Sequence, residues 1–468
     1  MEENGGGHTP EDASVADELI SPIGYTNSSK CGYCGTSGQS FSYYANTASL
    51  SPELYLTLLD RCWRRSGKLL YRPNQRVSCC PHYTIRLDSD QFYPTRGQRQ
   101  TINRFNKHVL GDNYIKQAAR LYPRSRQETK KRDNEFSLTE RIHEAEIGQI
   151  KTPPEPAHRW TVTLEEDNFT EEKYLVYENY QRVVHGDEPY ERSPESFRRF
   201  LCGSPLQRRT MVGPDGRKRR LGSYHQCYRL DGVLVAIGVL DLLPQCVSSV
   251  YFLYHESVHK FAPGKLGALY EIALAIEDGY RWWYPGFYIH SCPKMRYKID
   301  YGPQYILDPD TLEWRFLDKS ILNILARDTY TSLSAALVED VPPESDLHAT
   351  DAMNMDDSAG HEQNSVSSGE NSEDSDTEEE SGMSYKSLFQ SGMPGIPSVA
   401  DMEKFDLDHI VLRIFPTGPL FETSDLVGWR HGNMAEPSNV KHSIAQLIAA
   451  LGPDLMDRIC LDLVRRRG

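Results

Sequence analysis

Residues 223–289 constrain the fold more than any other part of the chain, because β-forming runs separated by turn residues precede one amphipathic helix. A tight turn at Asp231-Gly232 joins the first two of three predicted strands. A helix predicted over 265–277 has one apolar face, and residues 283–289 follow as a further strand. The three strands are 223–230, 233–243 and 247–254. Hairpins followed by a strand–helix–strand crossover indicate an α+β fold, a mixed sheet with helices packed on it.

Composition divides the rest of the chain into units. At 468 residues the chain is long enough for two or three domains. The expected units are a tail at 1–20, a cysteine-rich domain at 21–132, a linker at 133–159, the sheet domain at 160–338, an acidic insertion without fixed structure at 339–384 and a C-terminal segment at 385–468 that packs on the sheet domain. Patterning also predicts helices at 50–63, 170–184, 442–451 and 455–467 and strands at 77–87, 161–164 and 410–414.

The formal net charge of −14 belongs to one segment. Residues 339–380 hold 15 of the 66 acidic residues and none of the 52 basic ones, so the remaining 51 acids and 52 bases nearly balance. The net charge therefore does not exclude a nucleic-acid partner. The longest strongly apolar stretch, 233–243, is too short to span a membrane. The acidic N-terminus resembles no signal peptide, so we expect the cytoplasm or the nucleus.

Four cysteines predict a metal or cluster site. Cys31 and Cys34 form a Cys-x-x-Cys pair, whose spacing lets both thiolates reach one ion, and Cys79-Cys80 can supply a second pair. Four thiolates suit Zn²⁺ and an iron–sulfur cluster equally. The alternatives are two unrelated, inert cysteine pairs or a thioredoxin-type dithiol.

Basic residues occur in runs at 61–76, 120–132 and 217–220, in a chain with 27 Tyr and 6 Trp. A single charged run is usually a solvated face. Several runs interleaved with aromatic residues favour binding of an RNA backbone and of unpaired bases.

The chain resembles the eukaryotic arginyl-tRNA–protein transferase family over about residues 25–105 and 165–315. The resemblance is carried by the residues 31–34 (Cys-Gly-Tyr-Cys), 79–87 (Cys-Cys-Pro-His-Tyr-Thr-Ile-Arg-Leu), 223–226 (Ser-Tyr-His-Gln), 248–251 (Ser-Ser-Val-Tyr) with Asp241, and 284–298, which includes the run Ile289 to Lys298. It implies an acetyltransferase-like (GNAT) domain that transfers arginine from Arg-tRNA to proteins beginning with Asp, Glu or oxidised Cys and so marks them for degradation through the N-degron pathway. It also implies an iron–sulfur or zinc site at the cysteines. His255-Glu256 departs from the family pattern, where Asp-Pro is usual.

The implied reaction needs a grip on arginine, a cationic pocket for the acceptor's carboxylate, loss of a proton from the amine and stabilisation of the oxyanion. Asp241, at the end of a buried strand, is the candidate for cationic substrate groups, with a structural salt bridge as the alternative. His225 is a candidate base or a core histidine. Lys294, Arg296 and Lys298, read as alternating on an extended segment, form the candidate cationic pocket or a charged edge strand.

The remaining candidates are aromatic and polar side chains near these groups. Tyr297 is a candidate proton donor, and Glu271, off the apolar face of its helix, is either a solvated acid or a site residue. The other candidate substrate-binding residues are Tyr224, Gln226, Ser249, Tyr251, Lys265, Tyr284 and Tyr288. As core aromatics the tyrosines need no function.

The ester that links arginine to tRNA is already activated, so we expect no ATP, and the sequence has no Gly-x-x-x-x-Gly-Lys-[Ser/Thr] loop. The loop at 261–267 fits acetyl-CoA poorly, so that cofactor is not expected either. Arg-tRNA and acceptor proteins with acidic N-termini are the expected partners, without membrane or DNA. The alternative is a metal-stabilised RNA- or protein-binding module whose acetyltransferase-like domain is inactive.

Overall fold

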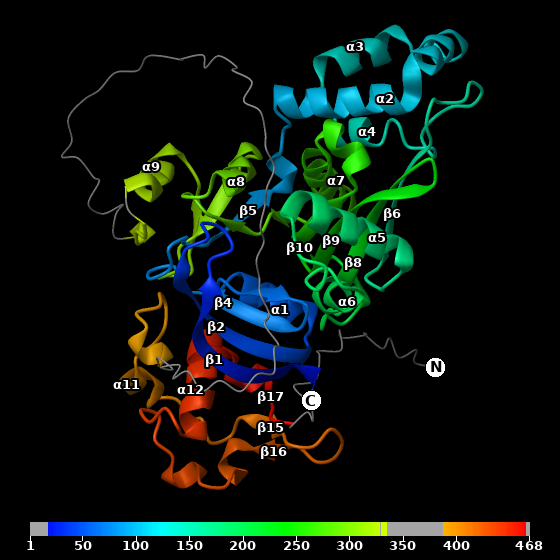
Figure 1. The fold of residues 1–468 in the computed structure, drawn as a ribbon. Helices are drawn as coiled ribbons and strands as arrows, with labels where there is room; N and C mark the ends of the chain where they lie inside the picture. Colours follow the sequence, from blue (N-terminus) through cyan, green and yellow to red (C-terminus); the bar gives the residue numbers. More distant parts are fainter. Residues whose placement is uncertain (1–16, 328, 335–386, 465–468) are drawn as a thin grey trace, which may run out of the picture.

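A computed structural model describes residues 17–327, 329–334 and 387–464. The molecule is elongated, with helices α2, α3 and α4 at one end and the C-terminal strands β15, β16 and β17 at the other (Figure 1). Two sheets lie between these ends, each with its own hydrophobic core. No helix within the described ranges is long and apolar enough to cross a membrane.

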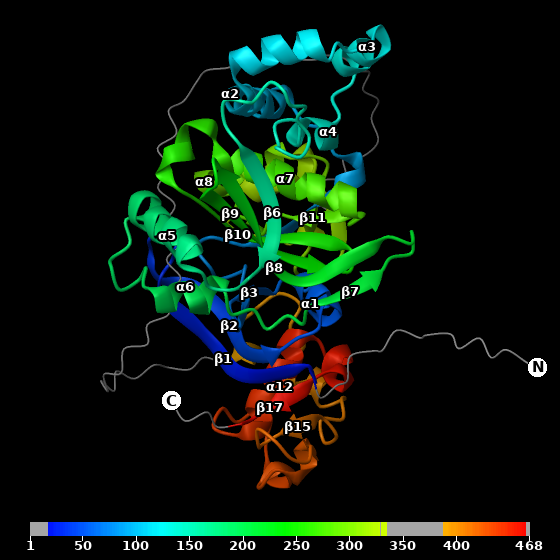
Figure 2. The ribbon, with the colours of Figure 1, turned by 90° about the vertical axis from the view of Figure 1, so that its right-hand side faces the viewer.

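The larger sheet confirms the predicted β-β-β-α-β block. Its ten strands run in the order β14-β13-β5-β11-β10-β9-β8-β6, with β12 paired to β5 and β7 to β8 (Figure 2). Only the β10–β11 pair is parallel, because helix α7 (Pro263–Asp278) crosses between them. The strands are β5 (Tyr83–Asp88), β6 (Trp160–Glu166), β7 (Arg209–Val212), β8 (Lys218–Leu230), β9 (Val233–Leu243), β10 (Cys246–Tyr254), β11 (Trp282–Tyr284), β12 (Phe287–Tyr288), β13 (Gln304–Leu307) and β14 (Trp314–Phe316).

The smaller sheet joins the two ends of the chain. Its order is β16-β15-β17-β1-β2-β4-β3. The strands are β1 (Leu19–Lys30), β2 (Ser37–Ser49), β3 (Arg64–Ser66), β4 (Leu69–Pro73), β15 (Val411–Arg413), β16 (Phe421–Glu422) and β17 (Cys460–Asp462). Helices α1 (Pro52–Leu59) and α12 (Val440–Leu451) contribute the apolar side chains of its core, such as Leu54 and Leu447.

The unit boundaries differ from the predicted ones. Residues 21–132 divide between the two sheets, since β5 joins the larger sheet while β1–β4 join the C-terminal strands. The segment after 387 completes the smaller sheet, and the expected linker at 133–159 buries Ile142 and Ala145 in the larger core. Each segment joins the sheet against which its apolar side chains are buried, whatever its place in the chain order. The predicted tail ends earlier than residue 20, because β1 begins at Leu19. The acidic segment predicted at 339–384 lies entirely outside the described residues.

The other helices are mostly capped as their sequences suggest. Most begin at a Ser or Thr N-cap, such as Ser193 for α6. They are α2 (Arg96–Leu121), α3 (Arg126–Asn134), α4 (Leu138–Ile142), α5 (Glu171–Tyr180, continued by a π-helical turn η3 at Gln181–His185), α6 (Pro194–Leu201), α8 (Pro293–Arg296), α9 (Lys319–Arg327) and α11 (Val399–Met402). The 3₁₀ turns are η2 (Ser89–Gln91), η4 (Glu256–Phe261), η5 (Tyr297–Asp300), η6 (Leu388–Gln390), η7 (Thr423–Asp425), η8 (Trp429–His431) and η9 (Pro453–Arg458).

Two predicted elements are wrong. Residues 294–298 are not extended, because Pro293 begins the short helix α8, which continues into η5. The described part of the predicted helix 455–467, residues 455–464, is not a helix, because η9 ends at Arg458 and residues 460–462 form β17, which pairs in parallel with β1. In both places a proline starts a turn that the apolar pattern does not show.

Candidate active site and metal centre

The central strands of the larger sheet separate at one point. The β10–β11 pairing ends at Ser248 opposite Tyr284, although β10 continues to Tyr254. After Tyr284 the chain turns at Pro285-Gly286 and forms β12 against β5 instead. A register irregularity follows Ser249, and residues 249–252 are partly exposed in the middle of the sheet. This separation leaves room for polar side chains from neighbouring elements.

Glu271 is the acidic residue at this separation of β10 and β11. Helix α7 holds its carboxylate, which accepts a hydrogen bond from Trp283 Nε1 at 2.8 Å and one from Ser249 Oγ at 3.4 Å. The side chain is 2% exposed, so the alternative of a solvated acid is wrong. Burial raises the pKa of Glu271 to about 7, against the opposing effect of the two hydrogen bonds. Tyr297 is 45% exposed as a whole residue, but desolvation of its hydroxyl, and then the charge of Glu271, raises its pKa to about 12.

Lys298 is the basic residue at this separation of β10 and β11. Its Nζ donates a hydrogen bond to the Phe287 carbonyl at 2.8 Å, and the residue is 8% exposed. Burial, and then the charge of Arg64, lowers the pKa of Lys298 to about 7. A Cβ on Gly286 would lie 3.5 Å from Lys298 Nζ and 4.0 Å from the Ser249 carbonyl, and its φ of +85° is unfavourable for other residues. Gly286 therefore keeps the space between β10 and Lys298 open.

Two further buried groups, which sequence reasoning did not single out, surround Phe287. The guanidinium of Arg64 lies 4.7 Å from the Phe287 ring centre, and His82 packs between the rings of Phe287 and Tyr33. Within the described part of the chain, Nε and Nη2 of Arg64 and Nδ1 of His82 are buried without a hydrogen-bond partner. Burial, and then the charge of Lys298, lowers the pKa of His82 to about 4. Buried donors without an acceptor fit a bound anion.

Asp241 does not reach this group. It is fully buried and forms a bidentate ion pair with Arg65, at 2.6 and 2.7 Å, and accepts a hydrogen bond from Ser223. The structural salt bridge, given above as the alternative, is what the structure contains. His225 is likewise buried, with Nε2 3.0 Å from the Leu201 carbonyl, and burial lowers its pKa to about 4. It fits the core-histidine alternative.

Replacing Asp241 by Asn is therefore expected to lower the free energy of unfolding by about 3–5 kcal/mol, because it leaves the Arg65 charge buried without a counter-charge. Denaturant unfolding measures this loss. Asp310→Asn, at a partly exposed pair with Arg76, is the matched control and should cost no more than about 1 kcal/mol. An unchanged stability of the Asp241 variant would contradict the structural role.

The other predicted residues fall into three groups. Ser249, Glu271, Tyr297 and Lys298 come together as described. Tyr251 lies on the same stretch of β10 and hydrogen-bonds Gln181 and His185. Gln226, on β8, lies near Glu271, since a Cβ on Gly238 would meet Glu271 Oε1 at 3.4 Å and Gln226 Cβ at 3.7 Å. The remainder lie elsewhere: Tyr224 on β8, Tyr284 hydrogen-bonded to Asp60, Tyr288 hydrogen-bonded to His290, and the exposed Lys265, Lys294 and Arg296. The predicted pocket of three alternating cations therefore reduces to Lys298, joined by Arg64.

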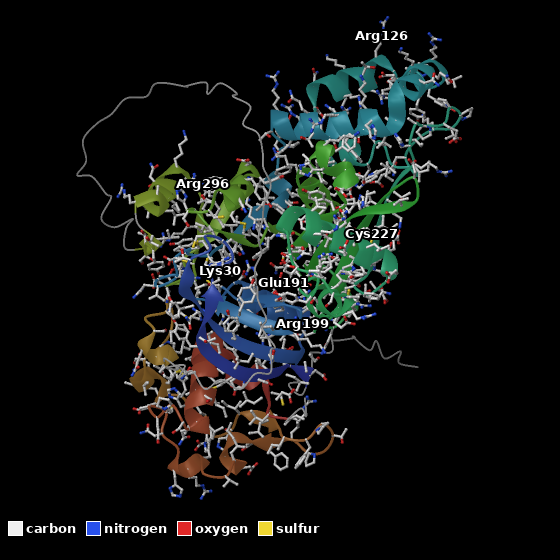
Figure 3. All side chains as sticks on the ribbon, in the orientation of Figure 1. Lys30, Arg126, Glu191, Arg199, Cys227 and Arg296 are labelled. Atoms are coloured by element: carbon white, nitrogen blue, oxygen red, sulfur yellow. The ribbon has the colours of Figure 1, made fainter. Side chains whose placement is uncertain are left out.

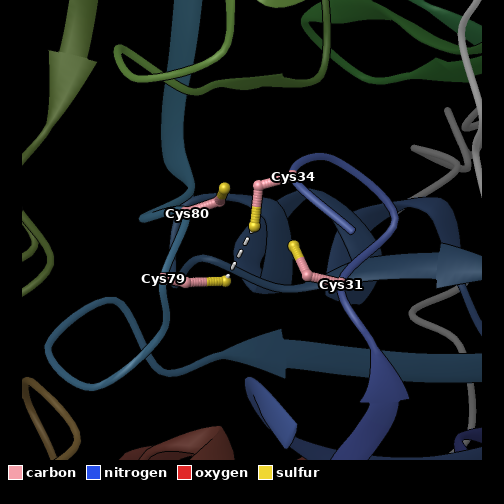
Figure 4. A group of neighbouring side chains, drawn as sticks. All are labelled: Cys31, Cys34, Cys79 and Cys80. Atoms are coloured by element: carbon pink, nitrogen blue, oxygen red, sulfur yellow. Dashed lines mark hydrogen bonds between the residues drawn. The ribbon is translucent and has the colours of Figure 1, made fainter. Parts of the chain in front are cut away.

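The four predicted cysteines do converge. The Sγ atoms of Cys31, Cys34, Cys79 and Cys80 all lie within 4.8 Å of one another, and those of Cys34 and Cys79 are 3.4 Å apart (Figure 4). Cys31 and Cys34 lie in the loop after β1, and Cys79-Cys80 precede β5, so the cluster links the two sheets. Although burial opposes it, hydrogen bonding with Thr36 and Cys79 lowers the pKa of Cys34 to about 6.

The cysteine cluster also contacts the segment that supplies Lys298. Cys31 and Cys80 pack against Ile289 and Cys292, with Met295 alongside. Residues 289–298 thus run from the cysteine cluster to the separation of β10 and β11.

Two family models match the chain. The model described as arginine-tRNA-protein transferase, N terminus, matches residues 29–100, and the model for the C terminus of the same proteins matches residues 172–308. Arg64, His82 and the four cysteines lie in the first range, and Glu271 and Lys298 in the second. Over these two ranges the chain is similar to the arginine-tRNA–protein transferase family.

Curated relatives within and beyond this transferase family differ in how much they share. Arginyl-tRNA–protein transferase 1 of Saccharomyces cerevisiae is 30% identical over 54% of this chain, and the chain spans only 48% of the yeast protein. The protein of the same name from Drosophila melanogaster is 28% identical over 63% of this chain and 82% of its own length. Aspartate/glutamate leucyltransferase of Stutzerimonas stutzeri is 26% identical over 54% of this chain and 80% of its own length.

Proposed function

We propose that the protein transfers arginine from Arg-tRNA to the α-amine of proteins that begin with Asp, Glu or oxidised Cys. The observation that carries the proposal is the buried carboxylate of Glu271 beside Lys298, at the separation of β10 and β11. A parallel strand pair that separates over a crossover helix supports an acetyltransferase-like (GNAT) arrangement for this sheet.

The reaction needs one proton removed from the acceptor's amine. An α-ammonium has a pKa near 7.7–8.0, and a carboxylate with a pKa of about 7 is a base of matched strength. Glu271 takes this proton as the amine nitrogen attacks the ester carbonyl of Arg-tRNA. The carbon–oxygen bond to the ribose then breaks, and the ribose oxygen leaves as a hydroxyl with the proton that Glu271 gives back. The hydroxyl of Tyr297 can donate a hydrogen bond to the developing oxyanion.

Lys298 and Arg64 are suited to the acceptor's first side chain. Both are buried cations beside Phe287, and two nitrogens of Arg64 have no protein acceptor among the described residues. A carboxylate bound there gains charge-assisted hydrogen bonds, whereas an amide side chain gains much less. The name of the Stutzerimonas relative, an aspartate/glutamate leucyltransferase, is consistent with a preference for acidic acceptors.

The two shifted groups predict the pH dependence of transfer. The pKa of Glu271 is raised, so the base form is lost as the pH falls below about 7. The pKa of Lys298 is lowered, so its charge is lost as the pH rises above about 7. We expect kcat/KM for a peptide beginning with Asp to have a bell-shaped dependence on pH with its maximum near pH 7. Because Glu271 and Lys298 interact, the two apparent pKa values of this profile describe the pair rather than either residue alone.

A peptide beginning with Asn should lack the alkaline limb of this profile, because it does not need the charged Lys298. Initial rates between pH 6 and 8, corrected for spontaneous hydrolysis of Arg-tRNA, test this. A flat profile for the Asp peptide over that range would contradict the assignment.

The cysteine cluster is suited to a single tetrahedral metal ion, for which Zn²⁺ is the best candidate. Zn–S bonds of about 2.3 Å place four sulfurs roughly 3.8 Å apart, which agrees with separations within 4.8 Å, whereas an iron–sulfur cluster spreads its ligands over several irons. Bound there, the ion would hold the loop after β1, the start of β5 and residues 289–292 together, a scaffolding role rather than a chemical one.

Replacing Cys34 and Cys79 by Ser is expected to release the metal and to lower the Tm by about 5–15 °C. Metal analysis should find about one ion per wild-type chain and none in the variant. The matched control is Cys202→Ser, a half-buried cysteine outside the cluster, which should keep the metal. Visible absorption and iron in the wild-type protein would contradict a single zinc ion.

Labelled aminoacyl-tRNA tests the proposed function. Label from Arg-tRNA should enter peptides beginning with Asp or Glu and not those beginning with Ala. Label from Leu-tRNA is the second outcome to examine, because the Stutzerimonas relative is named a leucyltransferase. Bound but untransferred Arg-tRNA would favour the alternative, an RNA- or protein-binding module. We place the activity in the cytoplasm and the nucleus, upstream of N-degron-dependent degradation.

A further inference from the structure

Of the three basic runs, the one at 120–132 has the most exposed bases. In the first run Arg64, Arg65 and Arg72 are buried. In the third run Arg219 is buried against Asp215, and Arg217 donates hydrogen bonds to the last carbonyls of α7. That run exposes three bases, Arg217, Lys218 and Arg220, whereas the run at 120–132 exposes five, Arg120, Arg124, Arg126, Lys130 and Lys131.

This run belongs to a structure that we call the basic arm, residues 112–134. It consists of the end of α2, after a break at Gly111 with φ +74°, together with α3. It carries seven basic residues against three acidic ones. None of the described side chains of helix α3 is buried, and a capping box between Ser125 and Glu128 stabilises its start, so these side chains offer the protein core no apolar face. Arg126 lies at the outer end of the molecule (Figure 3).

The basic arm is fixed to the rest of the protein. The hydroxyl of Tyr114 donates to the Lys151 carbonyl at 3.2 Å, and that of Tyr122 to the Pro153 carbonyl at 2.9 Å. Ion pairs tie Arg124 and Arg132 to Glu144, and Lys131 to Glu140. A charged ridge that is already ordered loses little entropy when it binds a rigid partner.

Four bases point away from these anchors. Lys116, Arg120, Arg126 and Lys130 are exposed and form no ion pair within the described residues. Their spacing along two consecutive helices matches a partner with regularly repeated negative charge, such as the phosphates of an RNA duplex.

Helix α2, whose last part belongs to the basic arm, begins near the proposed site. At the start of α2, Gln98 Nε2 donates to the Asp300 carbonyl at 3.1 Å, two residues after Lys298. From Gln98 the helix runs 13 residues to Gly111, roughly 20 Å at about 1.5 Å per residue. A tRNA whose 3′ end enters the site must carry its duplex away from it, and α2 and α3 lie beyond α7 at one end of the molecule (Figure 1).

We propose that the basic arm binds the phosphate backbone of the donor tRNA, beyond its 3′ end. This inference rests on the proposed function for the identity of the RNA. The contact supplies affinity without reading sequence, because it involves phosphates alone. It leaves the chemistry at Glu271 unchanged.

The test compares two triple variants. The arm variant is Arg120→Gln, Arg126→Gln and Lys130→Gln. The control variant is Lys404→Gln, Arg430→Gln and Arg458→Gln, which removes the same number of exposed positive charges near the opposite end of the molecule. The arm variant should bind uncharged tRNA at least about tenfold more weakly near physiological salt. The slope of log K against log salt should fall by about 2–3.

Assays of arginine transfer distinguish a failure of this inference from a failure of the proposed function. At saturating Arg-tRNA the arm variant should keep the wild-type kcat, and an arginylated short RNA hairpin that ends before the arm should be used equally well by both proteins. Equal tRNA affinity and salt slope in the arm and control variants would overturn the inference, even if the wild type transfers arginine. A wild type that binds tRNA through the arm and transfers nothing would instead overturn the proposed function.

Discussion

Replacing Glu271 by Gln is expected to slow arginine transfer by about 10²–10⁴-fold at saturating substrates. Gln keeps the size of the side chain and can still accept the Trp283 hydrogen bond, but it cannot take a proton from the acceptor's amine. The acid limb of the pH profile should disappear with the rate. Single-turnover transfer from bound Arg-tRNA measures the effect free of product release.

Glu18→Gln is the matched control for this substitution. Glu18 is also a buried carboxylate, accepts a hydrogen bond from the Ser51 amide, and has its pKa raised by burial, but it lies beside the smaller sheet. Its variant should transfer arginine at the wild-type rate. A Glu271 variant that is folded, binds Arg-tRNA and retains the wild-type rate would remove Glu271 from the chemistry.

Replacing Lys298 by Met is expected to lower kcat/KM for peptides beginning with Asp by about 10²–10³-fold, because it removes one partner of a buried charge pair. Met fills a similar volume, so the packing around Phe287 should survive. Peptides beginning with Asn gain little from the charge and should be affected much less. The discrimination between the two peptides is the measurement, since a general loss of folding would slow both alike.

Lys294→Met is the matched control, a lysine on the same short segment that is exposed. It should keep the preference for Asp over Asn. If instead Lys294→Met loses the preference and Lys298→Met keeps it, the acceptor pocket lies on the outer face of α8 rather than beside Gly286.

The sequence predicted the strands and the cysteine cluster best, because both depend on local patterns. An apolar run such as 233–243 forms a buried strand wherever it packs, and the Cys-x-x-Cys spacing already brings two thiolates together. The sequence also singled out Lys298, as part of a cationic pocket for the acceptor's carboxylate, and Glu271, as either a solvated acid or a site residue.

Prediction from the sequence failed for charged side chains whose partners lie far away in the chain. Asp241 is compensated by Arg65, 176 positions away, and no local pattern shows that pairing. Arg64 belongs to the same basic run, which the sequence assigns to RNA binding, although β3 buries it. Glu271 faces away from the apolar stripe of α7, yet Trp283 and Ser249 cover it there. Buried polar groups are therefore recognised only once the fold is known.

The location of the site can be tested most directly by photo-crosslinking. A peptide that begins with Asp and carries a photoreactive second residue is irradiated with the protein and uncharged tRNA, and adducts are mapped by mass spectrometry. We predict adducts on residues 249–252 or 286–298, reduced by excess unlabelled Asp peptide and not by the Asn peptide. Adducts confined to the smaller sheet, or equally reduced by both peptides, would contradict a transfer site between β10 and β11.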